Sequence, residues 1–225
     1  MKTPRSLDDL AFYESLSPLQ GSLDIDGDYD SILVTPQALD GAAIGATLSG
    51  ARFVESAFTG VTFDGTYMRR CRITDTWFGE ARFVAVDIAE STLVDAWLSG
   101  CVLAGVQAFS TLLRRVTFRG CKLDSVNFRD ATLTDVTFEE CVLRDADFAG
   151  AKLTRVRFPG CALTGATFTK ATCSAVDLRG ATLGAAASPG ITAGYDALRG
   201  ATIDSLQLMV LAPLLAHHLG IRVKD

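Results

Sequence analysis

The amino-acid sequence predicts an all-β protein, a four-sided β-helix with a capping helix at its C-terminal end. Three observations support this prediction. A large apolar residue returns at every fifth position, residues twenty apart are alike, and glycine recurs two places after the large residue. A period of five matches neither the 3.6 of a helix nor the 2 of a strand, so no ordinary amphipathic element explains the pattern. A fixed short period indicates a repeat architecture instead.

The five-residue repeat is regular from Leu48 to Leu183, with one clear breach. A small residue lies two places before each large one, and the glycines fall where a bend can require positive φ. At Ala108 the large side chain is missing, and Phe109 stands one place late. We therefore expect a gap in the core at Ala108, unless a local backbone shift brings Phe109 inward.

Residues twenty apart form columns, which means that four repeats make one turn of the coil. The large residues form these four columns: Phe128, Phe148 and Phe168; Leu93, Leu113, Leu133 and Leu153; Phe118, Phe138 and Phe158; and Leu103, Leu123, Leu143 and Leu163. The small position forms a column of Cys101, Cys121, Cys141 and Cys161. In the second half of the coil, phenylalanine occupies opposite sides and leucine the sides between them. This alternation can fill a narrow interior without voids.

The alternation of small and large residues resembles the pentapeptide-repeat family, with its A(D/N)LXX-type motif. The resemblance covers residues 46 to 185. It implies a right-handed quadrilateral β-helix, a pentapeptide-repeat solenoid of seven coils. With about 4.8 Å between coils, such a rod would be roughly 33 Å long. Each end of the rod has an open sheet edge that must be covered, because unpaired edges promote association.

The departures from the repeat divide the chain into four segments. We expect residues 1–45 to form an N-terminal segment with a short helix, capped by Ser6, and an irregular first coil. Residues 46–185 form the seven coils, and residues 186–203 form a loop and a final partial coil. Residues 204–225 are then the C-terminal helical cap and dimerisation tail.

The tail predicts a capped helix that is apolar on nearly every side. Asp204 and Gln207 give an Asp-x-x-Gln start, Pro213 predicts a kink or a split into two helices, and Gly220 predicts the end. One side can cover the open end of the rod, and the other then needs a second subunit. We therefore expect a symmetric homodimer. The expected interface consists of Leu206, Met209, Val210, Leu211, Leu214, Leu215 and Leu219.

The stretch GATIDSLQLMVLAPLLAHHLGIRV resembles the dimerisation tail of the bacterial gyrase-protecting pentapeptide proteins, the quinolone-resistance type. In that group two rods join tail to tail and imitate duplex DNA. The resemblance implies binding to DNA gyrase or topoisomerase IV and protection from inhibitors. The charges depart from DNA mimicry, because residues 46–205 hold seventeen Lys or Arg and seventeen Asp or Glu. The alternative is a structural or scaffolding rod with another protein partner.

Two groups of outward residues are candidate positions for binding a partner. Trp77 and Trp97 each precede a core residue and should stack on one outer face. They form either an exposed contact site or the place where the N-terminal segment folds back. The second group is a short acidic ladder of Glu55, Asp75 and Asp95. The same column continues with mixed sign through Arg115, Asp135 and Arg155.

We predict no catalytic, cofactor-binding or metal-binding residues, and therefore no enzyme. Cysteine sulfurs on successive coils should lie about 4.8 Å apart in a line, which suits neither tetrahedral zinc nor a disulfide. We expect these side chains to pack as small hydrophobes. His217 and His218 are the only histidines, and they lie where a helix C-terminus favours a positive charge.

The composition limits the possible partners and the location of the protein. The net charge of −5 argues against direct binding to nucleic acid. No segment is long and apolar enough for a membrane span, and the N-terminus lacks the apolar stretch of a secretory signal. We therefore expect a cytoplasmic protein with reduced cysteines.

Overall fold

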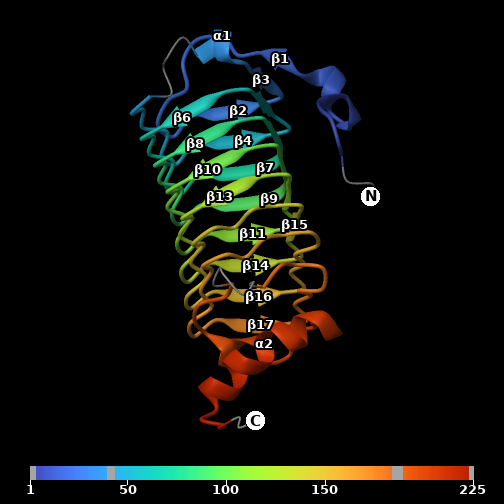
Figure 1. Ribbon diagram of the computed structural model, residues 1–225. Coiled ribbons are helices and arrows are strands. Elements are labelled where there is room, and N and C mark those ends of the chain that lie inside the picture. Colours follow the sequence, from blue (N-terminus) through green and yellow to red (C-terminus); the bar gives the residue numbers. More distant parts are fainter. Residues whose placement is uncertain (1–3, 40–43, 184–189, 223–225) are drawn as a thin grey trace.

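The computed structural model describes residues 4–39, 44–183 and 190–222 (Figure 1). Within these ranges the chain forms a rod of stacked coils. The N-terminal segment lies along one side of the rod, and helix α2 (Ser205–His218) covers its C-terminal end (Figure 1). The expectation of an all-β solenoid with a C-terminal helix is confirmed.

The rod has four faces, each made of short parallel strands. Face 1 contains β4 (Arg52–Val54), the first half of β7 (Arg72–Gly79), the first half of β9 (Thr92–Ser99), β11 (Leu112–Arg114), β14 (Thr132–Thr134), β16 (Lys152–Thr154) and β17 (Thr172–Ser174). Face 2 contains β5 (Ala57–Thr59), the second halves of β7 and β9, β12 (Thr117–Arg119) and β15 (Thr137–Glu139). Face 3 contains β6 (Thr62–Asp64), β8 (Arg82–Val84), β10 (Val102–Ala104) and β13 (Lys122–Asp124). Face 4 is held by isolated bridges such as Asp87 with Gln107.

The register between neighbouring coils is twenty residues. Leu113 pairs with Leu133 on face 1, and Phe118 pairs with Phe138 on face 2. Backbone hydrogen bonds join one coil to the next, for example from Phe138 N to the carbonyl oxygen of Arg157 at 2.9 Å. The columns inferred from the sequence are therefore the columns of the structure.

The four corners of each coil use left-handed backbone. Every fifth residue from Gly45 to Gly180 has positive φ, and many of these residues are not glycine. Glu55, for example, has φ of 44° and Asp75 has φ of 47°. Such corners cost roughly 1–2 kcal/mol each for a residue with a Cβ, and the hydrogen bonds between coils hold them in place.

Stacked aromatic rings fill the core in the second half of the rod. Phe138 stacks on Phe158 with ring centroids 5.1 Å apart and an interplanar angle of 4°. Across the interior, Phe138 meets Phe148 edge to face at 6.3 Å and 83°. Both arrangements are favourable for aromatic pairs. The expected alternation of phenylalanine on opposite sides is confirmed.

The coil that contains Ala108 is under-filled, as expected. Ala108 keeps the register and is buried, while Phe109 lies outside the core with the guanidinium of Arg69 5.4 Å from its ring centroid. The result is an apolar cavity of about 30 Å³ beside Ala108, lined by residues such as Ile88, Leu103 and Phe128. The backbone shift that would have brought Phe109 inward does not occur.

The N-terminal segment, which precedes the regular coils, consists of short elements. These are 3₁₀ helix η1 (Leu7–Asp9), 3₁₀ helix η2 (Tyr13–Ser15), β1 (Ser17–Pro18), β2 (Asp28–Asp30), β3 (Ile32–Val34) and α1 (Pro36–Leu39). The Asp9 carboxylate accepts a hydrogen bond from Ser6 N at 3.2 Å, which fixes the start of η1. Strand β2 pairs with β4 in a register of 24 residues, so the first coil is longer than the others.

The C-terminal end contains 3₁₀ helix η3 (Tyr195–Leu198) and α2. The predicted capping box is present: Gln207 N donates to Asp204 Oδ1, and Asp204 N donates to Gln207 Oε1, both at 2.9 Å. Pro213 lies inside a single continuous helix, so the split into two helices does not occur. The helix ends just before Gly220, which has φ of 71°.

The cavity yields a test of the packing. We expect Ala108→Leu to stabilise the protein by about 0.7 kcal/mol, because filling 30 Å³ at about 24 cal/mol per Å³ recovers that amount. Urea unfolding followed by circular dichroism measures the change. Ala146→Leu, at a small core position with no cavity beside it, is the control and should destabilise. Destabilisation by both substitutions would show that the space beside Ala108 cannot accept a side chain.

Candidate interaction surfaces

The N-terminal segment covers part of face 2. Trp77 points outward, as expected, but only 4% of it is exposed because it packs against Leu10 and Ala57. Trp97 is partly buried at the edge of the same small cluster. Trp77 is therefore not an exposed contact residue, and the structure has the alternative arrangement, in which the N-terminal segment folds back. An unpartnered apolar segment and an outward tryptophan cover one another.

A groove of about 1010 Å³ lies between the N-terminal segment and the rod. It is lined by Pro4, Asp9, Leu10, Ala11, Phe12, Ser15, Glu55, Asp75, Asp95, Trp97, Arg115, Thr117, Asp135, Thr137, Glu139 and Arg157. Of the five predicted binding residues it contains Glu55, Asp75, Asp95 and Trp97, and it excludes Trp77. A hollow of about 400 Å³ continues the groove towards the C-terminal end and shares Asp135, Thr137 and Arg157 with it.

The acidic ladder along this groove is neutralised at one end only. The guanidinium of Arg115 holds both carboxylate oxygens of Asp95, with Nε to Oδ1 at 2.6 Å. Arg155 holds Asp135 in the same way, at 2.6 and 2.8 Å. These bidentate pairs join residues one coil apart.

Glu55 and Asp75 stand at the other end of the ladder and have no ion pair within the described part of the chain. Burial raises the pKa of the Asp75 carboxyl, the negative charges of Asp95 and Glu55 raise it further, and the more distant charge of Arg115 offsets only part of the increase. The groove therefore has an excess of negative charge at this end.

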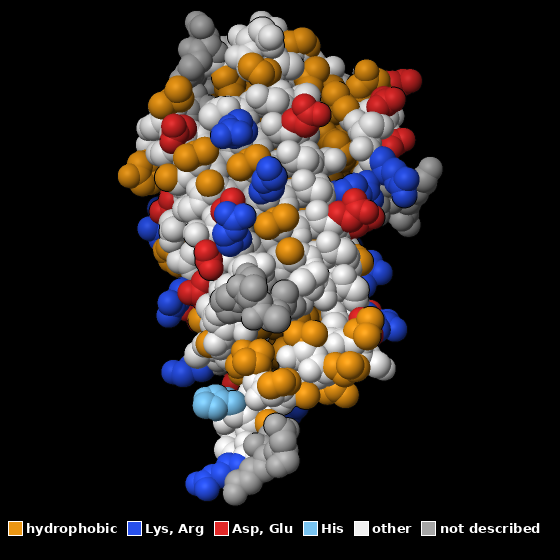
Figure 2. All heavy atoms as spheres, viewed as in Figure 1, with side chains coloured by type: hydrophobic (Ala, Val, Ile, Leu, Met, Phe, Trp, Pro, Cys, Tyr) orange, Lys and Arg blue, Asp and Glu red, His pale blue; other side chains and the backbone are white. Residues whose placement is uncertain are grey.

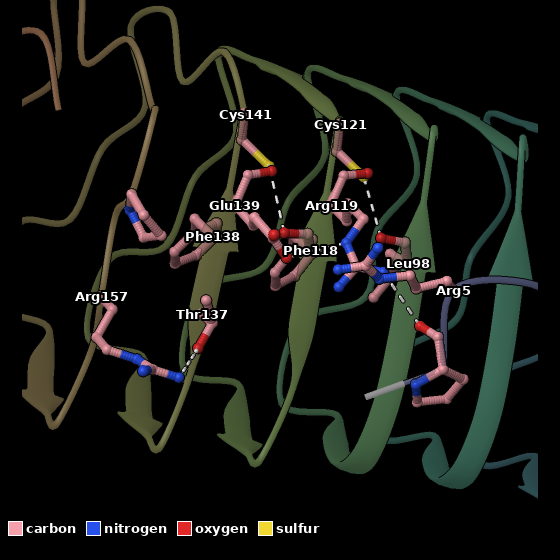
Figure 3. Close-up of polar contacts among 12 residues, drawn as sticks. Arg5, Leu98, Phe118, Arg119, Cys121, Thr137, Phe138, Glu139, Cys141 and Arg157 are labelled. Carbon is pink, nitrogen blue, oxygen red and sulfur yellow. Dashed lines mark hydrogen bonds and ion pairs between the residues drawn. The ribbon is translucent and has the colours of Figure 1, made fainter. Parts of the chain in front are cut away.

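At the opposite end of the groove one basic side chain, Arg157, lines the wall, and a second, Arg119, contacts two lining residues from outside it (Figure 3). Arg119 pairs with Glu139 at 2.9 Å and donates to the Pro4 carbonyl oxygen at 3.3 Å, which ties the N-terminal segment to the rod. Arg157 donates to the Thr137 hydroxyl at 3.2 Å and forms no ion pair with any described residue. Sequence reasoning missed Arg157 as a groove residue, because only the folded-back segment makes this face a groove.

The cysteine column lies in the core beside face 2. Cys121 Sγ contacts the Leu98 carbonyl oxygen at 3.3 Å, and Cys141 Sγ contacts that of Phe118 at 3.5 Å (Figure 3). Hydrogen bonding to Cys101, together with burial, raises the pKa of the Cys121 thiol to about 12. The expectation that these side chains pack in the core is confirmed. Among the described residues no group of three or more His, Cys, Asp or Glu could hold a metal ion.

Helix α2 closes the end of the rod through one of its sides. Gln207 Nε2 donates to the carbonyl oxygens of Leu178 and Ala181 at 2.5 and 2.7 Å, so it satisfies backbone acceptors of the last coil. Leu211 is 1% exposed, and Leu215 packs beside it against the core. Leu211 is thus buried against its own rod and cannot lie in the expected dimer interface, while Leu215 is only half-buried on the same side of the helix.

The other sides of α2 are apolar and exposed. The exposed residues on the helix are Leu206 (74%), Leu208, Met209 (70%), Val210 and Leu214, and Leu219 and Ile221 are exposed just after it. Hydrophobic side chains gather near this end in the space-filling view (Figure 2). Leu208 was not among the residues expected in the dimer interface, but it is exposed on the same helix. In the described ranges no helix is both long and apolar enough to cross a membrane.

Two family profiles match the chain. The profile described as "Pentapeptide repeat region" matches residues 111–187, and the profile described as "Pentapeptide repeats (8 copies)" matches residues 43–75. Both matches fall on the coils seen in the structure. The chain belongs to the pentapeptide-repeat family. No match was found among curated proteins.

Solved pentapeptide-repeat structures share the fold. HetL from the cyanobacterium Nostoc sp. strain PCC 7120, a pentapeptide repeat protein involved in regulating heterocyst differentiation, is 18% identical, with 82% of this chain and 84% of that chain covered and a TM-score of 0.56. QnrB1, a plasmid-mediated fluoroquinolone resistance protein, is 17% identical, with 92% and 96% covered and a TM-score of 0.49. The likeness to HetL shows a common β-helix and extends no further than the fold.

Proposed function

We propose that this pentapeptide-repeat protein is a non-catalytic, homodimeric rod that acts by binding other proteins. The observation that carries the proposal is the exposed apolar side of α2, whose opposite side already closes the rod. A contiguous apolar surface at the end of a rod is costly to leave in water. The same element of a second chain covers it most simply, across a two-fold axis.

The charges of the rod favour a scaffold over a DNA mimic. Acidic and basic side chains pair across neighbouring coils, as in Asp95 with Arg115 and Asp135 with Arg155. On the face seen in Figure 2, neither sign forms a continuous strip. A rod with paired charges has little to attract the basic surface of a nucleic-acid-binding protein, or nucleic acid itself. We place this scaffold in the cytoplasm and assign it no cofactor.

Dimerisation is tested by charging the exposed side of α2. We expect the double substitution Leu206→Glu with Met209→Glu to give a monomer, because it would place four carboxylates in the apolar contact of a symmetric dimer. Sedimentation velocity over a range of concentrations measures the change. Leu112→Glu, at an exposed leucine on face 1, is the control and should leave the dimer intact. A wild-type chain that sediments as a monomer at every concentration would show that α2 only caps the rod.

Protection of DNA gyrase or topoisomerase IV from inhibitors is a second candidate function. It is favoured by α2, a capped apolar helix with one side exposed at the end of the rod, as the tail resemblance implies. If this role holds, the protein should alter gyrase supercoiling in a fluoroquinolone at stoichiometric amounts. The effect should weaken with salt, since surface charges are screened over about 8 Å at physiological ionic strength. If micromolar protein has no effect on supercoiling, the gyrase role is rejected and the scaffold remains as the proposed function.

A further inference from the structure

The groove between the N-terminal segment and face 2 has the length of a short extended peptide. It runs from the coil of Glu55 to the coil of Arg157, five steps in the twenty-residue register. At about 4.8 Å per step the groove is about 24 Å long. An extended chain spans that length with about seven residues at about 3.3 Å each.

The Glu55 end of the groove lacks a cation. Further along the same column, each ladder acid is held by an arginine one coil away, as Asp95 is by Arg115. Glu55 and Asp75 sit on neighbouring coils and have no such partner among the described residues. A guanidinium or ammonium group placed beside them would form the same kind of ion pair that Asp95 forms with Arg115 and Asp135 forms with Arg155.

The middle of the groove can contact apolar and polar parts of a peptide. Trp97 lines the groove from the rod and is partly buried. Ala11 and Phe12 line the opposite wall, which the N-terminal segment forms. Thr117 and Thr137 add hydroxyl groups that can donate to, or accept from, a peptide backbone. An aromatic surface with a few well-placed polar groups is typical of binding sites in proteins.

The far end of the groove offers a positive charge. The Arg157 side chain contacts the Thr137 hydroxyl and forms no ion pair among the described residues. Asp177, the carboxylate on the next coil, is held by Arg179 at 2.7 and 2.9 Å. The groove is thus negative at the Glu55 end and positive at the Arg157 end.

We propose that the groove binds an extended segment of about seven residues from a partner protein. An Arg or Lys of that segment lies between Glu55 and Asp75, apolar residues cover Trp97, and a carboxylate meets Arg157. The proposal rests on the proposed function, binding of other proteins, and supplies the chemistry of the partner. It does not depend on the dimer, since no residue of α2 lines the groove.

The probes are two N-terminally labelled heptapeptides, Arg-Ala-Leu-Val-Ser-Thr-Glu and its reversed sequence, because the groove does not fix the chain direction. Fluorescence anisotropy with the full-length protein at low salt measures binding. At least one of the peptides should bind. The double substitution Glu55→Gln with Asp75→Asn should weaken binding at least tenfold, since hydrogen bonds to charged groups contribute about 1.5–3 kcal/mol. Gln and Asn have nearly the same shape as the Glu55 and Asp75 side chains that already occupy these left-handed corners, so the coil should still fold.

The matched control removes two acids from other corners of the rod. Glu80 and Glu140 are exposed, have positive φ and lie outside the groove. Glu80→Gln with Glu140→Gln should therefore bind like the wild type, although its net charge changes by the same amount. If both double variants weaken peptide binding equally, the loss reflects net charge alone and the proposal is overturned. The proposal is also overturned if neither peptide binds the wild type at 1 mM. If the peptides fail this test but the protein still sediments as a dimer, the proposed dimeric rod stands and only the peptide-binding groove is rejected.

Discussion

Stacking of coils at one fixed spacing is the constraint on which the whole structure depends. The twenty-residue register places each inward side chain directly over its counterpart in the next coil, as with Phe138 and Phe158. The interior can then be filled only if the volume of each coil stays nearly constant. The coil of Ala108 departs from this volume, and the departure appears as a cavity rather than as a shift of the backbone. Backbone pairing between coils therefore dominates over local side-chain preference.

The same constraint organises the surface. Because outward side chains also repeat every twenty residues, an acid on one coil lies beside the residue one turn later, which allows bidentate pairs such as Asp95 with Arg115. Such exposed pairs individually add little stability, and their main effect is to cancel charge along the rod. Surfaces with a distinct character arise where the pairing stops. Glu55 and Asp75 form one such place, and the exposed side of α2 forms another.

Most of the fold could be predicted from the sequence, because the repeat determines which residues point inward. The columns, the under-filled coil at Ala108 and the Asp204–Gln207 capping box all depend on local spacing. The sequence predicts the fold-back of the N-terminal segment over Trp77 and Trp97 only as one of two alternatives, and it does not show the groove, because no period connects Leu10 with Trp77. The assignment of Leu211 to the dimer interface was wrong for a related reason. On a helix that is apolar all round, the sequence does not show which side meets the rod.

The central claim is that the volume of the inward side chains, stacked in columns, stabilises the protein. Comparing the loss in unfolding free energy when a large and a small core side chain are each replaced by alanine tests it most directly. Unfolding in guanidinium of Phe138→Ala and Cys121→Ala, each against the wild type, measures the two contributions. Phe138→Ala should cost roughly 3–5 kcal/mol, since it opens a cavity in an aromatic stack, and Cys121→Ala should cost about 1 kcal/mol. Equal costs, or loss of a bound metal on Cys121→Ala, would contradict the account.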